Sequence, residues 1–368
     1  MNDYSRAVTL EILLTQRADK IKLCSAAQEK SCQRGPALGH KEERNYCAEG
    51  CQAVHLNVVS CVSLQEELTM QGIYYIDRHS GALRQEIVPG ERWLQWLYQT
   101  PVGTLTLHAV VKRAFLSQWY GWLMNRPASR SKIKEFVESL NIDLHETRRP
   151  LSDFNTFNEF FIRELTPEAR PIDRDPDAIV SPADGKVLAF SAMSDLESFF
   201  VKGQEFSKEK LLKDRVLREK FADGPLIIIR LAPGDYHRIH FPTDGYISAS
   251  TRIHGNYYSV SPYAVKQRLR IYWENVREYS ILESPSVGAM LICEVGATLV
   301  GSIVQNYTPE TDVLKGCEKG WFAFGGSTVI LLFEAGRIRI DRDLAEHSSD
   351  GYETSIKMGE RLACALSS

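Results

Sequence analysis

The sequence predicts an α+β protein in which a helical region precedes a strand-rich domain. Residues 70 to 150 have mostly helical periodicity, whereas residues 151 to 368 contain short apolar runs separated by turn residues. The second part shows no regular alternation of strands and helices, so a doubly wound parallel sheet is not expected. Residues 1 to 69 show neither a helical nor a strand periodicity, and they contain few apolar residues that could be buried. This predicts a poorly ordered extension.

The extension is followed by a second methionine, Met70, where the orderly sequence begins. The codons of the acidic and amide residues just upstream, residues 65 to 67, can spell a purine-rich ribosome-binding sequence. We therefore expect translation to start at Met70, with a disordered tail as the alternative. Five of the eight cysteines lie in the extension, but they lack the paired spacing of a zinc site. No metal site is predicted.

Composition and motifs exclude several classes of function. The formal net charge is −3, which argues against a global nucleic-acid-binding surface. No uninterrupted apolar run reaches the about 18 residues that predict a transmembrane helix. Neither a G-x-G-x-x-G nor a G-x-x-x-x-G-K-[ST] motif is present, so nucleotide binding has no support from motifs.

The helical region combines apolar and cationic side chains. ERWLQWLYQT, residues 91 to 100, is short and amphipathic, and a longer helical stretch follows Pro101. The cations of that stretch are Lys112, Arg113, Arg126, Arg130, Lys132 and Lys134. Aromatic bulk beside Lys and Arg is typical of a helix at an anionic membrane surface. The alternative is a helix pair packed on its own domain, and the pattern alone slightly favours that alternative.

The domain from residue 151 to residue 368 begins with a helical segment, FNTFNEFFIREL, and continues with apolar runs. Five runs are expected to form strands: residues 177–190, 224–250, 288–304, 320–334 and 337–341. The dipeptides Asp184-Gly185 and Asp244-Gly245 are expected to form tight turns between strands.

Three polar clusters interrupt these apolar runs. They contain Asp184, the pair His237 and His240, and Ser327. A carboxylate, an imidazole and a hydroxyl are the components of a base-activated nucleophile. Each cluster alone has a structural explanation, namely a turn aspartate, two hydrogen-bonded histidines, and a β-bulge at the glycine pair before Ser327. The combination predicts catalysis.

Six motifs occur in a fixed order: VSPADGKV, LAPGDYHRIHFPTDG, YYSV, VGATLVGSI, KGCEKGWFAFGGSTVILLFE and GYETSIKMGE. With FNTFNEFFIREL and GIYYIDRHSGAL upstream of them, the chain resembles the phosphatidylserine decarboxylase family from about Met70 to about Glu360. The family's cleavage motif is often Leu-Gly-Ser-Thr. Here it reads Gly-Gly-Ser-Thr at residues 325 to 328, a variant that keeps the Gly-Ser pair.

The resemblance implies a proenzyme that cuts itself between Gly326 and Ser327. The Ser327 Oγ would attack the carbonyl of Gly326, with His240 as the base and Asp184 as its orienting partner. β-Elimination would then release the upstream chain and leave a pyruvoyl group, the covalent cofactor, at the new N-terminus. The large and small chains would stay associated in a strand-rich catalytic domain with lipoyl-like, hammerhead-type hairpins.

The implied reaction is decarboxylation of phosphatidylserine to phosphatidylethanolamine through a Schiff base on the pyruvoyl group. His237 would hold the head group and assist proton transfer, a task that His240 could share. Tyr258 and Ser259 either line the site or pack on a strand face. The expected partners are the phospholipid and an anionic membrane surface, with peripheral attachment at the cytoplasmic side of the cell membrane. Nucleic acid is not an expected partner, and a homodimer is left open.

Two other functions remain open from the sequence. A pyruvoyl-dependent decarboxylase of a soluble amino acid would share the cleavage machinery, and the cationic, aromatic helices argue for a lipid instead. VSPADGKV also resembles hairpins of lipoyl-like and sugar-transport phosphocarrier domains, in which a histidine carries a phosphate. Such a module would remain uncut and would leave Gly326-Ser327 unexplained.

Overall fold

The computed structural model describes residues 73–88, 90–106, 114–192, 208–267, 269–297, 303–323 and 325–366. These residues belong to one compact unit that begins at Ile73. The expectations for residues 1 to 69, including the translation start, lie outside the described residues, as do Lys112 and Arg113. The boundary expected near residue 150 stays a prediction.

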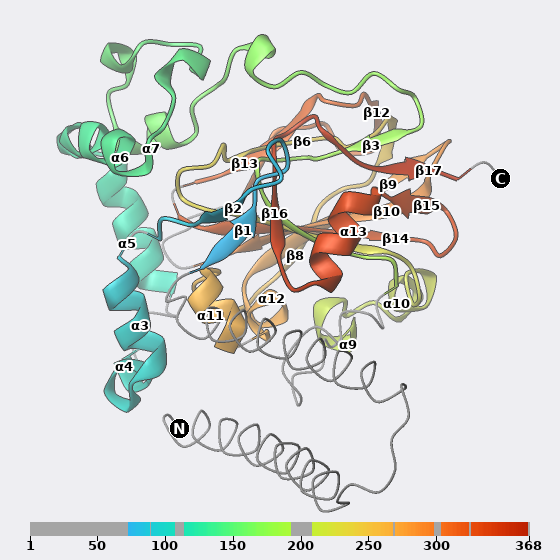
Figure 1. Ribbon diagram of the computed structural model, residues 1–368, viewed down its shortest axis with the longest axis horizontal. Helices are drawn as coiled ribbons and strands as arrows, with labels where there is room; N and C mark the ends of the chain where they lie inside the picture. The colour runs from blue at the N-terminus through green and yellow to red at the C-terminus, as the bar shows by residue number, and fades with distance from the viewer. Residues whose placement is uncertain are drawn as a thin grey trace, which may run out of the picture. The chain divides into compact units, whose positions relative to one another are not determined.

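An 11-stranded sheet is the largest element of the structure (Figure 1). Its strands are β1 (Tyr74–Ile76), β2 (Leu83–Gln85), β4 (Gly185–Phe190), β5 (Leu226–Leu231), β7 (Gly245–Ile247), β8 (Thr251–Ile253), β9 (Arg277–Ser284), β10 (Gly288–Gly296), β12 (Thr311–Val313), β14 (Ser327–Phe333) and β16 (Glu353–Ile356). They follow the order β12-β7-β9-β10-β14-β5-β4-β16-β1-β2, and β8 pairs with β9. Only the β1–β16 pairing described in this sheet is parallel. The strand-rich α+β class is therefore confirmed, whereas the lipoyl-like hairpins stay a prediction.

Two three-stranded sheets accompany the large one. The first has the order β11 (Ile303–Gln305), β13 (Glu318–Phe322) and β6 (Arg238–His240), and the second has β15 (Ile338–Ile340), β17 (Arg361–Ala365) and β3 (Ala178–Val180). The first small sheet packs on one face of the large sheet. A fully buried ion pair of 2.5 Å joins them, between Lys319 on β13 and Glu294 on β10. This face matters for the site, since β6 carries His240.

Strands β5 and β14 lie at the centre of the large sheet and are buried along their whole length. Their sequences, LIIIRL and STVILLF, are almost continuously apolar because both faces of the sheet are covered. Each residue from Ser327 to Leu332 has backbone partners on β10 and on β5. The residue that begins β14 is therefore held on both sides.

The helices are short: α3 (Glu91–Gln99), α4 (Pro101–Thr106), α5 (Ala114–Met124), α6 (Lys132–Leu140), α7 (Phe157–Phe161), α9 (Lys208–Leu211), α10 (Arg215–Lys220), α11 (Pro262–Gln267), α12 (Ile271–Glu274) and α13 (Arg342–Ser349). Helices α3, α4 and α5 form a column beside the strands, with α6 and α7 at one end of it (Figure 1). Helix α3 coincides with the amphipathic segment of residues 91 to 100. Among the described helices, none is both long and apolar enough to cross a membrane.

The two Asp-Gly dipeptides lie between strands, but they do not form hairpin turns. Gly185 begins β4 and Gly245 begins β7, and in each case the preceding strand belongs to a different sheet. A Cβ atom on Gly185 would lie 2.6 Å from the carbonyl oxygen of Arg230, and one on Gly245 would lie 2.5 Å from a backbone oxygen of β9. The expected position between strands is confirmed, and at both places the glycine allows a strand of the large sheet to approach closely.

Candidate active site

Ser327 is the first residue of β14 and is completely buried. It lies opposite Gly296 on β10 and opposite Leu231 on β5. Its Oγ has no hydrogen-bond partner among the described residues. Buried hydroxyl groups are nearly always hydrogen-bonded, so an unpaired one at the predicted cleavage position is an observation in favour of a chemical role.

The two glycines before Ser327 have different physical roles. Gly325 has φ of 133°, a conformation that residues with a Cβ rarely adopt. Gly326 is confined by packing instead, since a Cβ there would lie 3.2 Å from Cγ2 of Val260. Strand β14 begins only at Ser327, so the glycine pair precedes the strand. The β-bulge explanation is therefore not supported.

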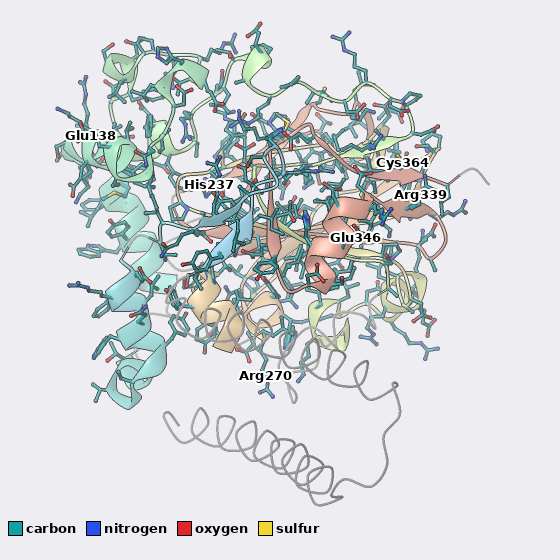
Figure 2. All side chains as sticks on the ribbon, viewed as in Figure 1. Glu138, His237, Arg270, Arg339, Glu346 and Cys364 are labelled. Atoms are coloured by element: carbon teal, nitrogen blue, oxygen red, sulfur yellow. The ribbon has the colours of Figure 1, made fainter. Side chains whose placement is uncertain are left out.

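His237 lies immediately before β6 and is fully buried within the strand-rich part of the structure (Figure 2). Its Nδ1 lies 2.8 Å from the carbonyl oxygen of Asp235, so Nδ1 donates its proton there and Nε2 keeps a lone pair. Burial lowers the pKa of His237 to about 4, although the backbone of Gly325 acts in the opposite direction. The ring is thus neutral and adjacent to the segment that precedes Ser327, and Nε2 has no hydrogen-bond partner among the described residues.

His240 is also buried, and both of its ring nitrogens are occupied. Its Nδ1 lies 2.9 Å from the carbonyl oxygen of Gly316, and its Nε2 lies 3.3 Å from the hydroxyl of Tyr236. Because a carbonyl only accepts, Nδ1 carries the proton and Nε2 is the basic nitrogen. Burial lowers the pKa of His240, and the Gly316 carbonyl partly offsets this effect.

The carboxylate of Asp184 is held by Arg170 and by the backbone of Met358. Arg170 donates from Nε and Nη2, and the Met358 N–H donates to Oδ1 at 2.8 Å. The charge of Asp184 raises the pKa of His240, so the two groups are close enough to interact. No direct hydrogen bond between them is present in the described part of the chain. The assignment of Asp184, His240 and Ser327 as one catalytic unit stays a prediction.

The YYSV segment is attached to the strand end that faces Ser327. Asn275 accepts from the N–H of Tyr258 at 2.9 Å and donates to the carbonyl oxygens of Tyr258 and Gly296, both at 2.8 Å. The N–H of Ser259 donates to the hydroxyl of Tyr98. Val260 is the residue of this segment that packs against Gly326. Roles for the Tyr258 and Ser259 side chains in substrate binding stay predictions.

Three residues of this site had no assignment from the sequence. Arg163 lies in FNTFNEFFIREL, which was interpreted only as a helical segment, and Arg170 and Asn275 lie in no quoted motif. For Arg163 a signal was available, because an arginine two residues after an aromatic helix, in FNEFFIR, is unusual in an apolar setting. Nothing local marks Asn275, since its partners are distant in sequence.

Ser327 is the residue on which a covalent carbonyl cofactor could form. Its buried position, the glycines before it and the free Nε2 of His237 fit a small, water-excluded reactive group. Within the described ranges, no group of three or more His, Cys, Asp and Glu side chains is placed to hold a metal ion.

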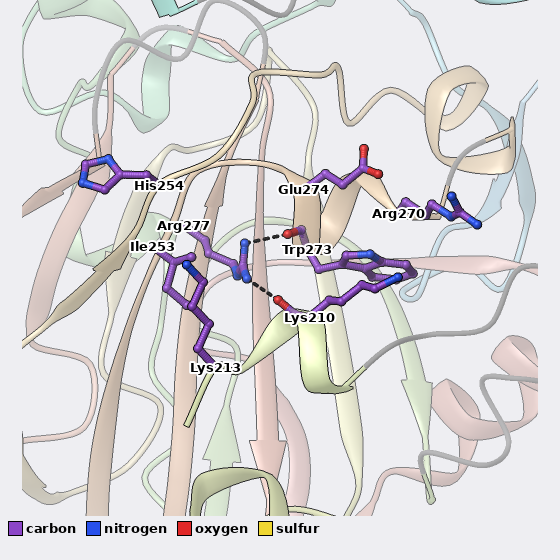
Figure 3. Close-up of a pocket in the computed structure, with 8 residues that line it drawn as sticks. All are labelled: Lys210, Lys213, Ile253, His254, Arg270, Trp273, Glu274 and Arg277. Carbon is purple, nitrogen blue, oxygen red and sulfur yellow. Dashed lines mark hydrogen bonds between the residues drawn. The ribbon is translucent and has the colours of Figure 1, made fainter. Parts of the chain in front are cut away.

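A cationic pocket of about 420 Å³ lies elsewhere, beside α9 and α12 (Figure 3). Arg277 at its floor donates to the carbonyl oxygens of Trp273 and Lys210. Arg277 pairs with Val295 on β10, and Ser327 pairs with the next residue of that strand, Gly296. Because successive residues of a strand point to opposite faces, Arg277 and Ser327 lie on opposite faces of the large sheet. The pocket is therefore separate from the candidate active site.

Comparison with known proteins gives a consistent result over most of the chain. Residues 157–364 match the family model described as phosphatidylserine decarboxylase. A phosphatidylserine decarboxylase proenzyme of Fusobacterium nucleatum subsp. nucleatum is 50% identical over 295 residues, which cover 80% of this chain and 98% of that protein. Proenzymes of the same description from Desulfitobacterium hafniense (strain Y51) and Clostridium novyi (strain NT) are 45% and 43% identical, over 79% and 76% of this chain and 97% and 95% of theirs.

Proposed function

Because the chain belongs to the phosphatidylserine decarboxylase family, we propose that it cuts itself before Ser327 and then decarboxylates phosphatidylserine to phosphatidylethanolamine. The observation that carries this proposal is the buried, unpaired Ser327 hydroxyl, which follows Gly325 in a backbone conformation that only glycine readily adopts. The phosphocarrier alternative is not supported, because the relatives are decarboxylase proenzymes matched over nearly their whole length.

In the cleavage step, the Ser327 Oγ attacks the carbonyl carbon of Gly326 as a base removes the hydroxyl proton. We assign His240 as this base, since its Nδ1 is fixed by the Gly316 carbonyl and its basic Nε2 is engaged only by the long 3.3 Å contact with the Tyr236 hydroxyl among the described residues. The peptide becomes an ester, removal of the Ser327 Cα proton expels the Gly326 carboxylate, and water converts the remaining enamine to a ketone with release of ammonia. The product is a pyruvoyl group at the start of β14.

For the decarboxylation step, this group would supply a carbonyl that can condense with the substrate amine, with loss of water, and accept the electron pair left by CO₂. The chain supplies positioning and proton transfer. His237 is neutral, because burial holds its pKa at about 4, so the lone pair on its Nε2 can accept a hydrogen bond from the head group of the substrate. The same ring is a candidate to assist proton transfer to the substrate carbon after CO₂ leaves, a task that His240 could share. The fully buried strand end keeps water away from that carbon.

A lipid substrate requires access to a membrane, and the helices beside the strands offer a suitable surface. Four of the six tryptophans are at least one-third exposed, and they lie on two helices: Trp93 and Trp96 on α3, and Trp119 and Trp122 on α5. The guanidinium of Arg126 lies 4.0 Å from the Trp122 ring. Exposed indoles beside cations suit the interface of an anionic bilayer. We propose that these helices attach the protein peripherally at the cytoplasmic side of the cell membrane.

Intact-mass analysis of purified protein tests the proposal, with Ser327→Ala as the control. The wild type should give two chains, the smaller starting at residue 327 and lighter by one ammonia than a serine terminus requires, and Ser327→Ala should stay whole.

His240→Gln should block cutting, whereas His237→Gln should be cut and then fail to release CO₂ from phosphatidylserine. A wild type that stays whole under native conditions contradicts the mechanism. A cut wild type that decarboxylates L-serine and not phosphatidylserine supports the soluble amino acid alternative.

A further inference from the structure

Arg163 is a buried arginine whose charge is only partly paired. It follows α7, and only 4% of its surface is exposed. Its Nη2 donates to the carbonyl oxygen of Gly234 at 3.2 Å, but Nε and Nη1 have no hydrogen-bond partner among the described residues. The guanidinium lies over the Phe160 ring at 5.1 Å. Burying a cation with most of its donors unpaired costs free energy of folding. Other interactions in the folded chain must therefore offset the cost of burying Arg163.

The acidic groups that act on Arg163 are already bound to other cations. Asp184 is held by Arg170 and Asp235 by Lys186, each through two or more hydrogen bonds. Glu146 is paired with Arg170 and with Lys357. The guanidinium of Arg163 is therefore placed near negative charge but is not neutralised by a carboxylate of its own. The unpaired donors of Arg163, on Nε and Nη1, can therefore donate hydrogen bonds to an external anion.

Arg163 and His237 are anchored side by side on one turn. Arg163 donates to the carbonyl of Gly234, and His237 donates to the carbonyl of the next residue, Asp235. The positive charge of Arg163 contributes to lowering the pKa of His237, and the Phe161 ring lies 4.1 Å from the His237 ring. His237 in turn interacts with the backbone of Gly325, two residues before Ser327. An anion bound to Arg163 would thus lie beside the reacting end of the substrate.

The substrate of the proposed function carries two anionic groups, the α-carboxylate and the phosphodiester. A cation that binds the carboxylate would stabilise the ground state relative to the transition state, because that charge leaves as CO₂. The phosphodiester keeps its charge throughout, so a guanidinium can hold it in every state along the reaction and position the amine near residue 327. We propose that Arg163 is a binding residue for the phosphodiester of the lipid head group. The proposal rests on the proposed function.

The test uses matured wild type, Arg163→Gln, Arg163→Lys and the control Arg149→Gln. Arg149 also lies over a phenylalanine ring, that of Phe154 at 4.7 Å, but it is exposed. Intact mass first establishes cutting. Phosphatidylserine turnover in mixed micelles then gives KM and kcat. Binding of glycerophosphoethanolamine and of ethanolamine, measured by calorimetry, reports on the phosphodiester without any reaction.

We expect Arg163→Gln to be cut normally, to raise KM by about tenfold or more, and to leave kcat within about threefold. The preference for glycerophosphoethanolamine over ethanolamine should fall by a similar factor, Arg163→Lys should keep part of it, and Arg149→Gln should match the wild type. A preference that survives in Arg163→Gln overturns the proposal. So does a failure of both Arg163 variants to be cut, since Arg163 would then serve the proenzyme. An uncut or inactive wild type would instead refute the proposed function.

Discussion

Arg170 and Asp184 form a doubly hydrogen-bonded ion pair in which Nε donates to Oδ1 at 2.8 Å and Nη2 donates to Oδ2 at 2.5 Å. Both side chains are more than nine-tenths buried. Burial alone would lower the pKa of Arg170, but Asp184 and Glu146 raise it, so the cation is retained. The pair thus fixes the carboxylate whose charge acts on His240.

Replacing Arg170 with Gln should slow self-cleavage and destabilise the fold. Among the described residues, the change leaves the buried carboxylate with the Met358 N–H as its one remaining donor, which costs about 3 kcal/mol in the free energy of unfolding. Urea unfolding in a Ser327→Ala background gives the stability, and gel analysis of the Ser327 form gives the cutting rate. Arg148→Gln removes an exposed ion pair with Glu164 and should cost less than about 1 kcal/mol. Cutting at the wild-type rate in Arg170→Gln would show that Asp184 needs no fixed position.

Stability should decrease as the pH falls below the ordinary pKa of histidine, and His237 should account for part of the decrease. The folded protein keeps His237 neutral down to about pH 4, whereas the unfolded chain binds a proton near pH 6.5. Between these values the unfolded state holds more protons, so stability rises with pH. Between pH 7 and pH 5 the contribution is about 2 kcal/mol.

Unfolding of Ser327→Ala protein at these two pH values measures this contribution by comparison with a variant that also carries His237→Gln. The pH-dependent loss should be smaller by that amount in the double variant. His145→Gln replaces an exposed histidine and should leave the loss unchanged. Equal losses with and without His237 would mean that the buried ring is protonated in the folded state.

The two glycines before Ser327 should respond differently to alanine. Gly325→Ala forces a Cβ into a backbone with φ of 133° and should cost about 1–3 kcal/mol and slow cutting. In Gly326→Ala the new Cβ would be crowded by Cγ2 of Val260 at 3.2 Å, whereas the carbonyl oxygen of Leu231 lies at an ordinary contact distance of 3.9 Å. A second substitution, Val260→Ala, should therefore restore part of the cutting rate. Gly336→Ala, at φ of 73° with open space around the new Cβ, controls for a left-handed backbone away from the site. Intact mass measured over time gives the cutting rate of each variant. If adding Val260→Ala does not raise the cutting rate of Gly326→Ala, the packing explanation for Gly326 is wrong.

Replacing Trp119 and Trp122 with alanine should weaken binding to anionic vesicles by about tenfold or more, because two half-exposed indoles lose their place in the interface. Co-sedimentation with phosphatidylglycerol-containing vesicles at two salt concentrations measures the affinity and its electrostatic part. Val216→Ala, an exposed apolar residue on α10, is the matched control. Unchanged binding in the tryptophan variant would locate the membrane-binding surface elsewhere.

Local patterns predicted the strands because each core strand is a nearly continuous apolar run, as in LIIIRL at β5 and STVILLF at β14. They did not predict which strands pair. Asp184-Gly185 was interpreted as a tight turn between strands, but the pattern did not show that the chain passes there from one sheet to another, or that the glycine lies against the Arg230 carbonyl of β5. Pairing depends on contacts between residues that are far apart in the sequence, which no local pattern contains.

The same distinction applies to the site. Ser327, His237 and His240 were identified because polar groups in apolar runs are conspicuous, and the motif order gave them a family. Arg170 and Asn275 act through partners such as Asp184 and Gly296. Their roles are therefore defined by three-dimensional proximity and became visible only in the structure.

The position of β14 between β10 and β5 has a consequence for the lifetime of the enzyme. If the chain is cut before Ser327, as proposed, the small chain would still supply β14 and β16 to the middle of the large sheet and β17 to the middle of a small one. A cut molecule that unfolds could refold only if two separate polypeptides associate again, because strands of the small chain lie between strands of the large chain. Such refolding would be a second-order reaction, whereas refolding of the intact precursor is first-order. If the chain matures as proposed, maturation would be a one-way event, and the supply of active protein would depend on new synthesis and on slow unfolding, because repair by refolding would be lost.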